Sequence, residues 1–184
     1  MKRPRLPARD LLPGMGEELI SPSDWSRRAA TLLGALLTNN DVYDRIASLI
    51  GSEHFYEPVH GRIFEVAAAR ISKNALATPV TLKAFLEDDE GLKELGGPGY
   101  LARLAGAAIA AYAVRDYAQM IHDLAIRREL ILLGQDIAAE AARMDVKNEP
   151  KEQIVQAEQK LYKLSETGTS ESGFQSFLSA VTEA

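Results

Sequence analysis

The sequence predicts an all-α fold, and two features of the apolar pattern carry that prediction. Apolar residues recur at i, i+3, i+4 and i+7 in one segment after another, which is the spacing that lines one face of a helix. No segment sustains the period-2 alternation of a half-buried strand. The expected layout is a flexible N-terminal arm (1–23), a compact helical globule (24–111), an antiparallel helical hairpin (112–165), and a tether with a short terminal linker helix (166–184).

The globule is expected to contain several short helices. Ser23 or Asp24 can cap a helix that runs to about Thr38, with four leucines on one face. Asn40 or Asp41 is expected to cap a second helix that Gly51 stops. Proline is tolerated in a first helical turn, so further helices are predicted to start at Pro58, near Pro79, and after the turn Gly96-Gly97-Pro98-Gly99.

The C-terminal third changes character, and its pattern predicts a hairpin. One long helix is expected from about Ala113 to Met144, and a second is expected from Pro150 to about Ser165. Apolar residues in the second helix step by 3, 4 and 3, which is core spacing over fewer than two heptads. Val155 and Tyr162 add apolar surface on another side of this helix, which is left for a second hairpin. The predicted hairpin interface comprises Ile154, Ala157, Leu161, Tyr162 and Leu164.

The last eleven positions read as an amphipathic helix after a Gly/Ser/Thr-rich tether at about 166–173. Its apolar face carries Phe174, Phe177, Leu178 and Val181. A helix this short is marginal alone in water, so it needs a surface on which to dock. No basic last turn, glycine or proline marks its end, and the chain is therefore expected to be part of something larger.

Composition excludes several function classes. The net charge is −5, whereas an autonomous nucleic-acid binder usually carries a basic surplus, so we expect little direct DNA binding. The absence of cysteine removes disulfides and thiolate zinc sites. There is neither a signal-peptide core nor a window resembling a membrane span, which predicts a cytoplasmic protein without membrane contact.

No residue pattern indicates catalysis. The P-loop motif is missing and no Gly-Lys dipeptide occurs, so ATP and magnesium have no site of that type in this chain. His60, His122 and Asp123 could together form a metal site, but a structural role for the two histidines is favoured over it. The acidic run 87–90 is interpreted as a solvated helix end, and the aromatic residues are interpreted as core rather than as a base-stacking platform. These features favour a non-catalytic helical assembly or docking module.

Several stretches together resemble the N-terminal domain of the DnaB-type replicative DNA helicases. They are Leu33-Gly34-Ala35-Leu36-Leu37, Phe55-Tyr56-Glu57-Pro58-Val59-His60-Gly61-Arg62-Ile63-Phe64, Pro79-Val80-Thr81-Leu82, Glu94-Leu95-Gly96-Gly97-Pro98-Gly99-Tyr100-Leu101 and Arg127-Arg128-Glu129-Leu130. Their order and spacing match the family across about 24–165. One departure is the segment Trp25–Ala30, which carries Arg27 and Arg28 where the family usually shows an acidic sequence.

The resemblance implies a role in DNA replication as the non-catalytic collar of a hexameric helicase. In the family this domain pairs through its hairpins into a trimer of dimers and receives primase. The linker helix docks on the ATPase domain of a neighbouring protomer, and ATP and magnesium belong to that motor domain. We expect the same partners here, with a partner-facing surface around Arg127, Arg128 and Ile131.

Two other functions are compatible with the sequence. The chain could be a stand-alone adaptor of the same fold that joins or regulates a helicase ring, and the reading frame downstream of Ala184 would distinguish the two. A helical DNA-binding regulator is disfavoured by the net charge of −5 and by the lack of a basic recognition helix.

Overall fold

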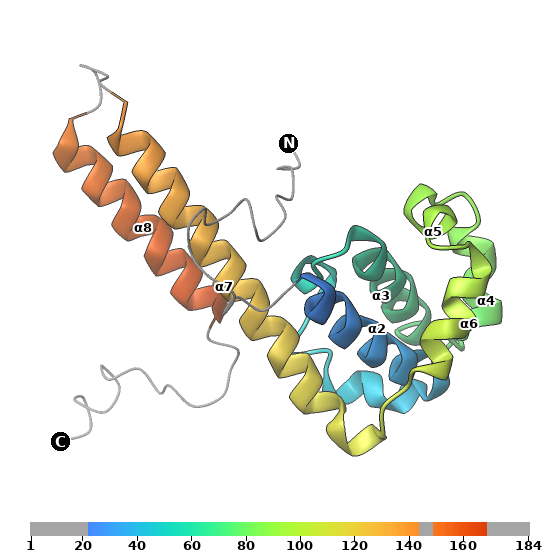
Figure 1. Ribbon diagram of the computed structural model, residues 1–184. Helices are drawn as coiled ribbons and strands as arrows, with labels where there is room; N and C mark the ends of the chain where they lie inside the picture. Colours follow the sequence, from blue (N-terminus) through green and yellow to red (C-terminus); the bar gives the residue numbers. More distant parts are fainter. Residues whose placement is uncertain (1–21, 144–148, 169–184) are drawn as a thin grey trace, which may run out of the picture. The chain divides into compact units, whose positions relative to one another are not determined.

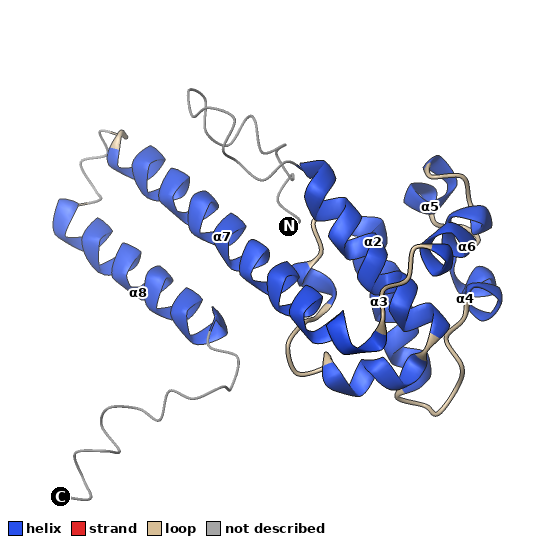
Figure 2. Cartoon of the chain, turned by 60° about the horizontal axis from the view of Figure 1, so that its bottom comes forward, coloured by secondary structure: helices blue, strands red, loops and turns tan. Residues whose placement is uncertain are grey.

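The computed structural model describes residues 22–143 and 149–168, which form helices joined by turns without any β-strand (Figure 2). The all-α prediction is therefore confirmed. The chain divides between Ala125 and Ile126 into two compact units (Figure 1). None of the described helices combines the length and apolarity needed to cross a bilayer. The predicted linker helix and nearly all of the predicted N-terminal arm lie outside the described residues.

Helix α2 (Pro22–Thr38) contributes the largest share of the buried leucines in the first unit. The leucines at 32, 33, 36 and 37 are all buried, as their spacing predicted. Helix α6 (Pro98–Gly106) packs along α2, and the approach is close at one point. A Cβ on Gly34 would lie 2.1 Å from the carbonyl oxygen of Leu104. Only glycine therefore permits this contact without a shift of the backbone.

The segment after α2 differs from the prediction, because it is the short 3-10 helix η1 (Asn40–Arg45) rather than an α-helix. Asn39 is the cap, since its side chain accepts from the amide of Asp41 at 3.0 Å. The side chain of Asn40 instead forms two hydrogen bonds, both of 2.9 Å, with the backbone N–H and C=O of Ala77. Asn40 thus joins the start of η1 to the loop that contains Ala77 and is not available as a helix cap.

Helix α3 (Pro58–Ile71) starts at the predicted proline, after the short 3-10 helix η2 (Ser52–His54). The fixed φ of proline suits the first helical turn, where its missing N–H costs nothing. Val59, Ile63 and Phe64 are buried in the core of the unit. A Cβ on Gly61 would lie 2.6 Å from the carbonyl oxygen of Ser52, so η2 lies directly against the start of α3.

Two short helices follow, α4 (Pro79–Leu86) and α5 (Glu90–Glu94). Thr78 caps α4, because its hydroxyl accepts from the amide of Thr81 while the Thr81 hydroxyl accepts from the amide of Thr78. Helix α5 is an element that the sequence reasoning missed. It begins inside the acidic run, with Asp89 as its N-cap. The turn into α6 uses positive φ at Gly96 (100°) and Gly97 (63°), which favours glycine.

The 3-10 helix η3 (Ala111–Ala113) leads into the long helix α7 (Val114–Ala141). Its first residues, including Val114, Ala118 and Ile121, belong to the core of the first unit. The remainder of α7 belongs to the second unit, where α8 (Pro150–Gly168) lies antiparallel beside it (Figures 1 and 2). The predicted hairpin is thus present.

Candidate interaction surface

Within the second unit, α8 presents a narrow packed stripe toward α7. The partly buried positions are Gln153, Ala157, Lys160 and Leu164, which step by 4, 3 and 4. The Nζ atom of Lys160 forms an ion pair with the carboxylate of Glu140 in α7, at 3.2 Å from Oε1. Leu133 is the most buried residue of α7 in this unit. This spacing is the expected seam of a two-helix contact. Two of its four side chains are polar, which is why apolar periodicity alone did not locate it.

The exposed side of α8 carries large apolar side chains. Ile154 and Leu161 are one heptad apart, as are Val155 and Tyr162, so each pair shares a side of the helix. Their exposed fractions are 60%, 43%, 50% and 65% respectively. We call these four residues the α8 apolar face. On a third side, Gln156 and Gln159 are exposed and polar. The two pairs lie about 100° apart around α8, with the exposed Glu158 between them. A cluster of exposed large apolar side chains is typical of an interaction surface.

The five residues predicted for the hairpin interface therefore fall into two groups. Ala157 and Leu164 lie in the seam against α7, whereas Ile154, Leu161 and Tyr162 lie on the α8 apolar face. The Tyr162 hydroxyl donates a hydrogen bond to the carboxylate of Glu166, one turn later. This hydrogen bond raises the pKa of Tyr162. The sequence reasoning missed Gln153 and Lys160, whose polar side chains gave no apolar signal.

The predicted partner-facing residues lie where α7 enters the second unit. Arg127 is exposed, while Arg128 and Ile131 are partly buried. The three side chains span just over one helical turn. The apolar residues proposed for docking on a neighbouring protomer, Phe174, Phe177, Leu178 and Val181, lie outside the described residues.

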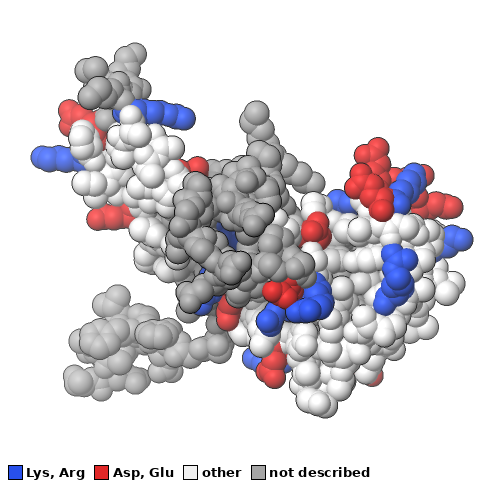
Figure 3. All heavy atoms as spheres, in the orientation of Figure 1, with Lys and Arg blue, Asp and Glu red and all other residues white. Residues whose placement is uncertain are grey.

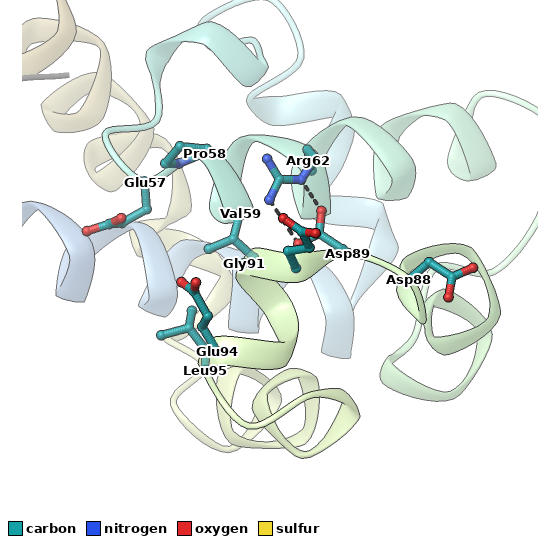
Figure 4. Close-up of a pocket in the computed structure, with 10 residues that line it drawn as sticks. Glu57, Pro58, Val59, Arg62, Asp88, Asp89, Gly91, Glu94 and Leu95 are labelled. Carbon is teal, nitrogen blue, oxygen red and sulfur yellow. Dashed lines mark hydrogen bonds and ion pairs between the residues drawn. The ribbon is translucent and has the colours of Figure 1, made fainter. Parts of the chain in front are cut away.

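In the first unit, an open hollow of about 650 Å³ lies between the start of α3 and helix α5 (Figure 4). Arg62 crosses it and forms a two-pronged ion pair with Asp89, with one Nη2–Oδ1 contact of 2.8 Å. The Oδ1 atom also accepts from the amide of Leu92 at 2.8 Å. The Arg62 guanidinium, together with this amide, holds the pKa of Asp89 below its usual range. Asp89 therefore has a structural role, which corrects the interpretation of the acidic run as a wholly solvated helix end.

Two of the histidines considered as metal ligands are buried structural residues. His60 is 2% exposed, and its Nε2 lies 2.5 Å from the hydroxyl of Tyr100. The ring of His122, 3% exposed, lies 5.0 Å from that of His54. The described part of the chain contains no group of three or more potential metal ligands.

Two further side-chain groups bear on nucleic-acid binding. Charged side chains on the visible face occur in small groups of both signs (Figure 3). Phe85, predicted to be core, is 60% exposed, with the Arg70 guanidinium 5.0 Å from its ring centre. Neither feature is the basic, aromatic groove that a strand of nucleic acid requires.

Comparison with known protein families identifies the family of this chain. The family model described as "DnaB-like helicase N terminal domain" matches residues 29–123. The chain belongs to this family. The replicative DNA helicase DnaB of Rickettsia bellii is 38% identical over 153 residues, covering 83% of this chain but 31% of that protein. The chain thus spans about a third of the length of this relative.

Solved structures agree on the fold of this DnaB-like N-terminal domain. The crystal structure of the N-terminal domain of DnaB helicase from Mycobacterium tuberculosis matches with a TM-score of 0.68 at 21% identity, covering 75% of this chain and 96% of that chain. The structure of a DnaB-like replicative helicase, studied with its interactions with primase, matches with a TM-score of 0.62 at 22% identity, covering 85% of this chain and 34% of that chain.

The packing explains the residues that carried the resemblance to the DnaB-like N-terminal domain. Gly34 permits the contact between α2 and α6, and Gly96 and Gly97 form the turn that leads into α6. That turn places Tyr100 against His60 of α3. These residues of the matching stretches therefore lie where helices of the first unit meet.

Proposed function

We propose that this chain is the non-catalytic collar and primase-docking domain of a hexameric replicative DNA helicase. The α8 apolar face carries the proposal. Its large apolar side chains are exposed on α8, in a domain whose family supplies the N-terminal part of DnaB helicases. A second hairpin of the same kind would cover this face in a symmetric dimer, because such an interface is self-complementary.

Primase is the proposed partner of the assembled collar. The DnaB-like relative of known structure was studied with its interactions with primase. Arg127, Arg128 and Ile131 at the base of the hairpin are the proposed contact region, since a basic and apolar turn can bind an acidic helix on a partner. Calorimetric titration with primase from the same organism tests this. We expect saturable binding by the native chain and weaker binding by Arg127→Glu. No binding at tens of micromolar would contradict the primase role.

The terminal segment carries the proposed contact with the motor. We propose that Phe174, Phe177, Leu178 and Val181 dock on the ATPase domain of a neighbouring protomer, where ATP and magnesium would also bind. Replacing Phe177 and Leu178 with aspartate should abolish binding to an added ATPase domain without changing the melting curve of the chain. A lower melting temperature would instead indicate that the segment packs on its own domain.

A further inference from the structure

A second surface of the first unit has a distinct chemistry. A hollow of about 290 Å³ is lined by Arg27, Arg28 and Thr31 of α2 and by Tyr117 of α7. The hollow is separate from the Arg62–Asp89 pair and from the α8 apolar face.

The two arginines are in different electrostatic situations. Arg27 is paired with Asp24, one turn earlier, at 2.5 Å. Arg28 pairs with no carboxylate within the described part of the chain. Its Nη1 atom donates to the sulfur of Met120 at 2.7 Å, and its buried Nε has no acceptor. A thioether is a weak acceptor. The charge on Arg28 is thus partly removed from water without an oxygen to balance it.

A partly buried guanidinium without a carboxylate partner is suited to bind an oxyanion. Arginine presents a planar fork that binds two oxygens of one carboxylate or phosphate. The Thr31 hydroxyl donates to the carbonyl oxygen of Arg27 at 2.7 Å. Thr31 and Tyr117 complete the lining. Met120, beside the guanidinium, is 42% exposed and adds apolar surface next to the charge.

We propose that this hollow binds a carboxylate side chain from an acidic segment of a protein partner. Two observations favour a protein over nucleic acid. Among the described residues, only Arg28 of the two arginines lacks an ion-pair partner, whereas a nucleic-acid strand needs a row of cations to match its phosphates. The exposed Met120 suits an apolar residue next to the carboxylate. Its lining residues differ from those proposed for hairpin pairing and for primase binding.

The chain contains a built-in reporter for the test. Its single tryptophan, Trp25, lies three residues before Arg28 on α2, with its ring 4.9 Å from that of Tyr56. Tryptophan fluorescence of the full chain would be followed during titration with a hexaglutamate peptide. Parallel titrations would use hexalysine, a short oligothymidylate and inorganic phosphate.

We expect saturable binding of hexaglutamate, weakened by about tenfold or more in Arg28→Gln because the fork is lost. Arg28→Lys should retain part of the affinity. Lys83→Gln removes the same unit of charge from exposed α4 and should bind as the native chain does. Thermal melting of each variant shows that it is folded.

Three outcomes would overturn the proposal. The first is equal affinity in Arg28→Gln and the native chain. The second is an equal loss in Lys83→Gln, which would mean unspecific attraction. The third is Arg28-dependent binding of oligothymidylate or phosphate without binding of hexaglutamate, which would identify a phosphate site.

Discussion

The Nε2 atom of His60 lies 2.5 Å from the hydroxyl of Tyr100, and this contact joins α3 to α6 in the interior of the globule. The two rings are nearly parallel, at 14°. His60 is 2% exposed, and burial lowers its pKa to about 4. Burial and the nearby carboxylate of Glu57 raise the pKa of Tyr100. Both groups are therefore neutral in the folded domain at neutral pH.

The His60 pKa predicts a pH-dependent stability. Because the folded-state pKa of about 4 lies below the ordinary 6.5, the unfolded chain binds a proton first as the pH falls. The contribution of neutral His60 to the free energy of unfolding is fully present well above pH 6.5 and is lost as the pH falls toward 4. The total loss is about 3 kcal/mol, at about 1.36 kcal/mol per pKa unit. Urea unfolding measured across this range gives the slope. His60→Gln, which does not titrate, should be less pH-dependent by this amount, and an unchanged slope would contradict the assignment.

Asp89 should contribute far more to stability than its neighbour Asp88. The Asp89 side chain is 11% exposed, caps α5 and pairs with Arg62, whereas the Asp88 side chain is fully exposed. Loss of the cap and of a partly buried ion pair predicts a cost of about 2 kcal/mol for Asp89→Ala. Asp88→Ala should leave the free energy of unfolding nearly unchanged, because exposed ion pairs contribute little. Equal effects in chemical denaturation would exclude the structural role of Asp89.

Two glycines provide a matched test of the contact between α2 and α6. Gly34→Ala places a Cβ 2.1 Å from the Leu104 carbonyl oxygen, which should destabilise the domain by about 1–3 kcal/mol. Gly134→Ala on α7 meets nothing within 4 Å, so it should stabilise by about 0.5–1 kcal/mol through helix propensity. Thermal unfolding of both variants measures the difference. A neutral Gly34→Ala would mean that the helices are farther apart.

The sequence-based predictions failed at polar side chains whose partners are distant in the sequence. Periodicity located the buried leucines of α2 and the helix starts at Pro58 and Pro79, because apolar spacing and proline geometry are local signals. Asn40 bonds Ala77, which is 37 residues away, and such a long-range contact leaves no local pattern. Asp89 looked solvated for the same reason, since its partner Arg62 lies in another helix.

The α8 helix illustrates a related limit. Apolar spacing alone could not distinguish the side of α8 that packs within the hairpin from the side that faces outward. Lys160, in the seam, pairs with Glu140, while Ile154 is exposed. The assignment of each side therefore depends on the backbone arrangement and not on hydrophobicity.

Sedimentation of two matched α8 variants tests the central claim, that the α8 apolar face pairs two chains. Leu161→Asp places a charge on this face, and Gln156→Asp places the same charge on the exposed polar side of the same helix. At tens of micromolar we predict a concentration-dependent dimer or hexamer for the native chain and for Gln156→Asp, and a folded monomer for Leu161→Asp. A native chain that remains monomeric, or a Leu161→Asp variant that assembles as the native chain does, would contradict the account.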